Sequence, residues 1–225
     1  MSHYFSRAQL LDRPLDMALL ASLSRHGDAY RDHALVWRLF PGDNEQRDFL
    51  FRRELDARGK AFYYVVSARA PIAEAGLLAV QSKPYAPVFE SGDWVRFDLR
   101  ANPTVARRDA AGGKSRRHDV LMEAKRQGAS LPEASRNDLI TERSLAWLSS
   151  RGEDWGLEFQ EESVLTTAYT QHRLHHKKRS IEFSSFDYQG LAQVTDPARL
   201  AAKLVGGVGH ARAFGCGLLL VKRVS

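Results

Sequence analysis

The sequence predicts an α+β protein made of two consecutive domains, residues 1–88 and 93–225. Three observations support this. The 225 residues suffice for two domains of about 100 residues each. The expected strands and helices of the first half recur in similar mixed order in the second half. Between them, residues 84–93 hold two prolines and a glycine, which is typical of a connection between domains.

In the first half, apolar and β-branched residues predict strands at 3–11, 49–55, 61–68 and 77–81. Leucines spaced four residues apart predict a short helix over 14–24, which begins at a proline. After a break that contains glycine, residues 29–40 predict a second helix. Asp28 is its expected N-cap, and the proline–glycine pair at 41–42 is its expected stop.

In the second half, strict alternation of apolar and polar residues predicts a half-buried strand at 94–100. Composition predicts helices at 119–127, 141–148 and 197–205, a glycine-containing loop at 110–114, and a last strand at 216–224. Residues 163–171 and 180–188 read as the two arms of a hairpin, because both are rich in β-branched and aromatic residues. The basic stretch 173–179 forms its predicted tip.

The net charge of +6 is concentrated in the second half. Residues 100–126 hold eight basic and three acidic side chains, whereas residues 127–163 hold three basic and eight acidic ones. Residues 164–180 hold four basic side chains and no acidic one. Segregated charge of this kind indicates a polyanionic partner, most often nucleic acid. Two solvated faces without a partner are the alternative that charge alone leaves open.

Composition also excludes several classes of protein. With 44% hydrophobic and 27% charged residues, extended disorder is not expected. The single cysteine, Cys216, excludes a disulfide framework and a cysteine-based zinc site, and it favours a reducing compartment. No apolar run approaches the roughly 20 residues that span a bilayer. We therefore expect a cytoplasmic protein that does not bind membranes.

The most unusual segment is 206–217, which holds five glycines. Glycines permit left-handed backbone and let a chain approach a ligand closely, and exposed amides can bind phosphate. The segment is neither a Walker loop nor a Rossmann fingerprint, because no G-K-[ST] follows and it joins a helix to a strand. Taken alone, the segment is better explained as a tight helix-to-strand connection whose glycines serve packing.

Together with three other segments, this loop resembles the signature of CRISPR repeat-RNA processing endoribonucleases of the type I-E subfamily. The segments are YRDH at 30–33 followed by WRLFP at 37–41, RDFLF at 47–51, and RFDLRANP at 96–103. They occur in the family's order and cover both halves. The chain differs from the family pattern at His210, where proline is frequent, and at Arg212, where lysine is common.

The resemblance implies two ferredoxin-like (RRM-like) domains and a metal-independent endoribonuclease without cofactors. Its implied reaction is cleavage of CRISPR precursor RNA within the repeat, at the base of the hairpin, leaving a 2′,3′-cyclic phosphate and a 5′-hydroxyl. The implied partners are the repeat RNA, the 3′ hairpin of the mature guide RNA, and the other protein subunits of a type I-E Cascade surveillance complex.

Two residues are candidates for the chemistry. RNA cleavage needs a base for the 2′-hydroxyl and an acid for the leaving 5′-oxygen, and histidine suits either role. His33 lies three residues after Tyr30, so both share one helix face. The nearby helix N-terminus should favour a neutral imidazole and attract phosphate. The resemblance assigns catalysis to His33 and Tyr30, and a capping or surface histidine is the alternative.

The RNA-binding candidates combine the basic segments with the glycine-rich loop. A-form RNA has a major groove too narrow for base reading, so we expect contacts mainly to phosphates. Three histidines on the hairpin, His172, His175 and His176, suggest a metal site, but their basic neighbours favour RNA contact. The candidates are Arg100, Asn102, Arg107, Arg108, Lys114, Arg116, Arg117, Arg173, Lys177, Lys178, Arg179, Gly207, Gly209, His210 and Arg212.

Two rival functions remain open. A repeat-RNA binding subunit that caps the guide RNA without cutting it would need the same basic surface, but it would not need His33. A metal-dependent nuclease would need a close cluster of carboxylates, which the sequence does not suggest. For residues 114–117, a solvated loop is as good an interpretation as a phosphate contact.

Overall fold

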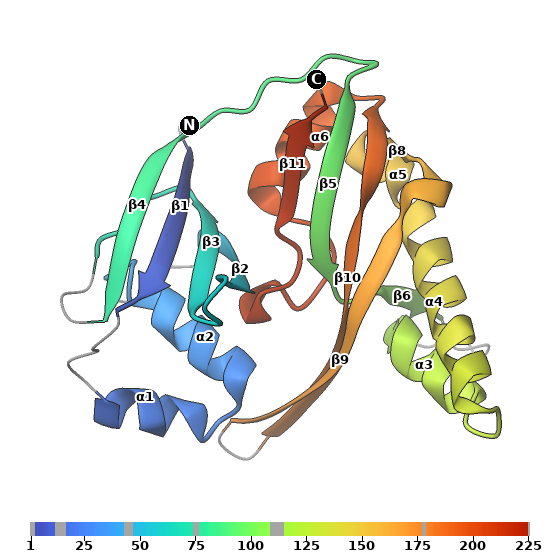
Figure 1. Cartoon of the computed structure of the whole chain (residues 1–225), viewed down its shortest axis with the longest axis horizontal. Helices are drawn as coiled ribbons and strands as arrows, with labels where there is room; N and C mark the ends of the chain where they lie inside the picture. The colour runs from blue at the N-terminus through green and yellow to red at the C-terminus, as the bar shows by residue number, and fades with distance from the viewer. Residues whose placement is uncertain are drawn as a thin grey trace.

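The computed structural model describes residues 3–11, 17–42, 47–73, 77–108, 115–176 and 179–224. Within these ranges the chain forms two main antiparallel sheets, one from each half, which stand side by side (Figure 1). The α+β fold class predicted from the sequence is confirmed. None of the helices in the described ranges is long and apolar enough to cross a bilayer.

The first half builds a four-stranded sheet backed by two helices. Its elements are β1 (His3–Leu10), α1 (Met17–Ser24), α2 (Asp28–Trp37), β2 (Phe49–Leu55), β3 (Ala61–Ser67) and β4 (Leu78–Tyr85). The strand order is β2-β3-β1-β4, so β1 pairs with both β3 and β4. Leu35 and Val36 of α2 are buried against the sheet, as are Leu39 and Phe40 just after it, and this fixes the orientation of α2. The helix ends at Trp37, three residues before the predicted end. The opposite face of α2 is left for other contacts.

The second half builds a larger sheet with its own core. Its elements are β5 (Trp94–Ala101), β6 (Thr104–Arg107), β7 (Arg116–Asp119), α3 (Val120–Gln127), α4 (Glu133–Ser149), α5 (Gly152–Trp155), β8 (Leu157–Phe159), η1 (Glu161–Ser163), β9 (Leu165–His176), β10 (Arg179–Val194), α6 (Pro197–Gly206), η2 (Arg212–Phe214) and β11 (Leu219–Arg223). The strand order is β11-β5-β10-β8. Strand β9 pairs with the first part of β10, and β6 pairs with β7 as a separate two-stranded sheet. Aromatic and aliphatic side chains between this sheet and the helices form the core.

Several boundaries differ from the sequence prediction. Asp28 is not the N-cap of α2, because the cap position falls on Gly27 and Asp28 is the first helical residue, ion-paired with Arg31 at 2.8 Å. Helix α4 begins at Glu133, eight residues before the predicted start. Its first turns are polar and exposed, so no apolar pattern marks them in the sequence. Strands β6, β7 and β8 and helix α5 were not predicted.

Strand β4 runs into the segment predicted to connect the two halves. Pro84 lies opposite Tyr4 in the β1–β4 register, and the strand ends only at Tyr85. β4 is an edge strand, and an edge position tolerates a proline that lacks an N–H donor. The connection between the two sheets therefore begins at residue 86.

The β9–β10 hairpin is longer than predicted and reaches the first half. Most of the expected basic tip is strand, with Leu174 opposite Ile181 and Arg179 opposite His176. In Figure 1 the hairpin extends from the second sheet toward α1 and α2. Gly27, with φ +96°, sits against it: a Cβ there would lie 3.3 Å from the Arg173 carbonyl oxygen. The start of α2 thus packs directly on the hairpin.

The two halves share apolar and polar contacts. One buried cluster joins Ala29 of α2 to Leu174, Phe183 and Cys216 of the second half. A second cluster joins Leu50 and Val66 to Leu218. Arg52 of β2, whose side chain is 3% exposed, donates from Nη1 to Asp98 Oδ1 of β5 at 2.5 Å.

Candidate active site and RNA interface

Both residues predicted to be catalytic lie on the free face of α2. Tyr30, His33, Ala34 and Trp37 together line an open hollow of about 310 Å³. Their spacing of three and four residues brings them to the same side of the helix. The prediction that Tyr30 and His33 share a helix face is therefore confirmed. Tyr30 also packs against the buried cluster that ties α2 to the hairpin.

His33 is half-buried among aromatic rings. Its ring centroid lies 5.6 Å from that of Trp37 and 6.1 Å from that of Phe214. Burial lowers the pKa of His33 below its ordinary value; a hydrogen bond with the Ala213 backbone opposes this, and the charge of Arg47 lowers the pKa further. The imidazole is therefore neutral near pH 7, as expected, although burial rather than the helix N-terminus is the main cause.

The glycine-rich loop brings η2 against α2. Gly207, Gly209, Gly215 and Gly217 all have positive φ, as does Ala211. At Gly217 the fold admits no side chain, because a Cβ would lie 2.2 Å from the Val208 carbonyl oxygen. These left-handed positions fold the chain back on itself tightly, and they place Ala213 and Phe214 beside His33.

Sequence reasoning missed one basic side chain at this site. Arg47 precedes β2 and lies close enough to lower the pKa of His33. The pKa of Arg47 is itself lowered, mainly by burial and in addition by the charge of Arg212 in η2. A signal was available, because Arg47 opens the 47–51 segment that carries the family resemblance. Nothing in the local sequence, however, pairs it with Arg212.

Two predicted RNA-binding residues have their polar groups engaged inside the protein. Arg100 forms a bidentate ion pair with Asp187, with both N–O distances 2.7 Å, and donates to the Arg53 carbonyl at 3.1 Å. Asn102 is 4% exposed and donates to Asp119 at 2.8 Å and to the Ser184 carbonyl at 2.7 Å. The bonds to Asp187, Asp119 and Ser184 stabilise the second half, whereas the bond to the Arg53 carbonyl joins Arg100 to β2 of the first half. RNA contact by either residue stays a prediction.

Other predicted RNA-binding residues lie on the surface. Arg107, Arg108, Arg116 and Arg117 are exposed, with Arg107 ion-paired to Glu123 at 2.6 Å. Lys114, Lys177 and Lys178 lie outside the described residues.

His210, in the glycine-rich loop, forms an isolated backbone bridge with Asn102. Burial lowers the pKa of His210, and the charges of Arg117, Arg212 and Arg151 add to the effect. Arg151, which lies over the Trp147 ring at 5.6 Å, was not predicted. Three arginines from different parts of the second half therefore lie near enough to His210 to lower its pKa.

On the hairpin, Arg173 is exposed and pairs with Glu182 at 3.3 Å. His172 is held differently, since its Nε2 lies 2.8 Å from Ser185 Oγ and its ring stacks on Phe183. No group of three or more potential metal-ligating side chains occurs among the described residues.

Comparison with known proteins gives the family. A family model described as "CRISPR associated protein" matches residues 4–223. The chain belongs to this family of CRISPR-associated proteins. It is 27% identical over 195 residues to the CRISPR system Cascade subunit CasE of Escherichia coli K12, covering 85% of this chain and 90% of that protein.

A second relative is the CRISPR-associated endoribonuclease Cse3 of Thermus thermophilus, which is 30% identical over 151 residues and covers 62% of this chain and 60% of that protein. A solved structure of Thermus thermophilus Cse3, bound to an RNA representing a pre-cleavage complex, matches with a TM-score of 0.71. The match has 25% identity and covers 99% of this chain and all of that one. The type I-E resemblance and the predicted fold of two ferredoxin-like domains are thereby confirmed.

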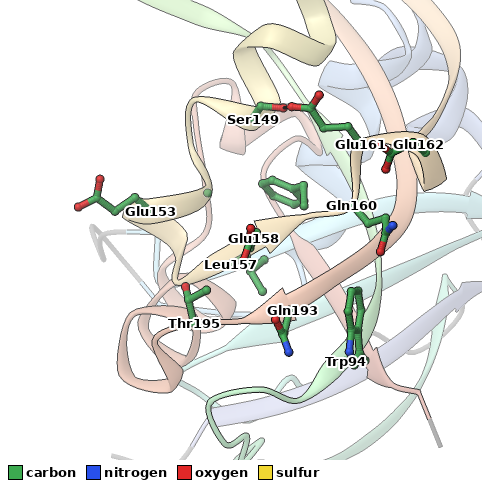
Figure 2. A pocket seen from close by; sticks show the side chains of 12 residues that line it. Trp94, Ser149, Glu153, Leu157, Glu158, Gln160, Glu161, Glu162, Gln193 and Thr195 are labelled. Atoms are coloured by element: carbon green, nitrogen blue, oxygen red, sulfur yellow. Dashed lines mark hydrogen bonds between the residues drawn. The ribbon is translucent and has the colours of Figure 1, made fainter.

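This CRISPR-associated protein also has a larger hollow, of about 830 Å³, away from α2 (Figure 2). It lies around β8 and η1 and is lined by Trp94, Gln193 and four glutamates, of which Glu161 accepts a hydrogen bond from Ser149 at 2.7 Å. A concentration of carboxylates repels the phosphates of RNA. The charge of this larger hollow therefore disfavours RNA there.

Proposed function

We propose that this chain is a metal-independent endoribonuclease that cuts CRISPR precursor RNA within the repeat, at the base of its hairpin. We infer that it then stays bound to the 3′ hairpin of the mature guide RNA as a subunit of a type I-E surveillance complex. Membership of the family supports this proposal, and so do the names of its relatives, a Cascade subunit and an endoribonuclease.

One observation carries the proposal: a neutral histidine stands beside a tyrosine in an open hollow, with basic side chains on the segments that surround it. A neutral imidazole can accept a proton, and the hollow admits a phosphodiester. The neighbouring arginines favour a polyanion at this place. A purely structural histidine would need neither an open hollow nor cations nearby.

In the proposed reaction, a base removes the proton of the 2′-hydroxyl and the 2′-oxygen attacks the adjacent phosphorus. The bond from phosphorus to the 5′-oxygen breaks, and an acid donates a proton to that oxygen. The products are a 2′,3′-cyclic phosphate and a 5′-hydroxyl. His33 supplies one of the two proton transfers, and Tyr30 assists through its hydroxyl.

The experiment is a cleavage assay on the repeat RNA of the host, with wild type, His33→Ala and an RNA that carries one deoxynucleotide just upstream of the cut. We expect wild type to cut in EDTA, His33→Ala to bind without cutting efficiently, and the deoxy substrate to resist cleavage. Cleavage of the deoxy RNA that stops in EDTA would indicate a metal-activated water instead. Binding by wild type without any cleavage would indicate a capping subunit.

A further inference from the structure

Arg47 lies near His33, and Arg212 lies near Arg47. Arg212 donates from Nη1 to the Gly206 carbonyl at 2.6 Å, and Arg47 has a buried Nη1 without a hydrogen-bond partner. In the part of the chain that the structure describes, neither guanidinium forms an ion pair with a carboxylate. The acid next to Arg47 in sequence, Asp48, is engaged by Arg69 at 2.7 and 3.0 Å.

An arrangement of this kind costs free energy in the absence of a ligand. A half-buried guanidinium loses hydration, and a second cation nearby adds repulsion. One ring nitrogen of His33 adds to this cost: its Nδ1 is buried without a hydrogen-bond partner among the described residues, despite the hydrogen bond that the imidazole forms with the Ala213 backbone. Unbalanced charge and unpaired polar atoms in one place are typical of a site whose partner is a ligand.

The two arginines approach His33 from different halves of the chain. Arg47 leads into β2, and the ring of Phe49, two residues later, lies 5.2 Å from that of Trp37 in the wall of the hollow. Arg212 begins η2, which also supplies Phe214 next to His33. An anion bound between the arginines would therefore lie on the side of α2 that carries His33 and Trp37.

We propose that Arg47 and Arg212 bind the scissile phosphate of the RNA, and that Arg47 is a catalytic residue that stabilises the charge of the transition state. This rests on the proposed function. As the 2′-oxygen attacks, the non-bridging oxygens gain negative charge, which a guanidinium can meet with two parallel hydrogen bonds. Arg47 exchanges no proton, so the base and the acid of the reaction are unchanged.

The decisive test is a binding experiment on RNA that cannot be cut. Repeat RNAs are made with one neutral methylphosphonate at successive positions around the hairpin base, each with a deoxynucleotide on its 5′ side. On the unmodified-phosphate control, Arg47→Ala should bind about tenfold more weakly than wild type. At one methylphosphonate position this difference should vanish. A difference that persists at every position would overturn the proposal.

Cleavage gives the second readout. Arg47→Ala should lower the single-turnover rate by about 10²-fold. Arg47→Lys should lower it less, because lysine keeps the positive charge but cannot form the two parallel hydrogen bonds of a guanidinium. Arg58→Ala, at an exposed arginine of the same half, should change neither binding nor rate. If wild type cuts no RNA, the proposed function fails, whereas the methylphosphonate comparison still decides whether Arg47 binds a phosphate. Equal melting temperatures of the Arg47 variants and wild type exclude misfolding.

Discussion

The imidazole of His172 stacks on the phenyl ring of Phe183, with centroids 4.4 Å apart and planes inclined by 14°. Phe183 in turn stacks on Phe214 at 5.5 Å, and Phe214 lies 6.1 Å from His33. A continuous row of rings thus joins the β9–β10 hairpin to His33 of α2. RNA bound to the hairpin and a phosphate beside His33 would therefore contact opposite ends of the same row of packed rings.

Phe214→Ala should therefore reduce cleavage more than binding. Removing this ring leaves His33 without one of its aromatic neighbours, and a small displacement of a catalytic group costs roughly 10- to 100-fold in rate. Single-turnover rates and repeat-RNA affinities, measured on the same preparations, check this. If affinity falls as much as the rate, the ring supports RNA binding rather than the position of His33.

His33→Ala should lower the cleavage rate by roughly 10²–10⁴-fold, the range typical of losing a positioned acid or base. Repeat-RNA affinity should stay similar. For Tyr30→Phe we expect a smaller loss, because water or a neighbouring donor can replace the hydroxyl. Cleavage by His33→Ala at nearly the wild-type rate would remove His33 from the mechanism.

The pH dependence follows from the lowered pKa of His33. If His33 is the base, protonation inactivates it, so the rate should fall on acidification with a midpoint below the ordinary value of 6.5. Arg47→Ala removes a repulsive charge and should move this midpoint upward. A rate–pH profile of both proteins measures it. A rate that instead rises as the pH falls through this range would assign His33 to the acid role.

Arg100 and Arg107 allow a matched test of stability. Arg100→Ala leaves Asp187, whose side chain is 10% exposed, without its bidentate partner, so the free energy of unfolding should fall by about 3 kcal/mol. Arg107→Ala breaks a pair in which the arginine is 56% exposed, and the change should be about 0–1 kcal/mol. Urea denaturation compares the two. Equal, small losses would indicate that the main role of Arg100 is to contact RNA rather than to stabilise the fold.

The hairpin tip should contribute through phosphates. Each phosphate contact adds roughly −0.9 to the slope of log affinity against log salt, so Lys177, Lys178 and Arg179 changed together to Ala should flatten that slope by about two to three units. Cleavage at saturating protein should survive, because His33 and Tyr30 lie on α2. An unchanged slope would move the RNA-binding face to the exposed arginines of β6 and β7.

Local sequence patterns were enough to predict α2 and the face that carries Tyr30 and His33. The adjacent apolar residues Leu35 and Val36 mark the side that is buried against the sheet, and the i, i+3 spacing of Tyr30 and His33 predicts that these two share another face. Local pattern could not predict Phe214 beside His33, or Arg47 beside Arg212. These pairs are far apart in sequence, and only the tertiary packing of the glycine-rich loop against the first half brings them together.

The boundaries that were wrong have specific causes. Propensity rules penalise the proline at 84 within a strand, but β4 is an edge strand where a missing donor costs little. The first turns of α4 are polar because they face solvent, so no apolar stripe marks them. Asp28 has a typical capping side chain, yet the packing of Gly27 against the hairpin moves the helix start by one residue.

The buried cluster of Ala29, Leu174, Phe183 and Cys216 has a practical consequence for dissecting the protein. If the chain were cut at residues 86–93, the first fragment would expose the apolar side chains of α2 that the hairpin now buries. The second fragment would expose Leu174 and Phe183 to solvent. Leu50 and Leu218 would be uncovered in the same way. Fragments of this kind tend to aggregate or to reassociate, so each half should be studied by substitution within the intact chain rather than by truncation.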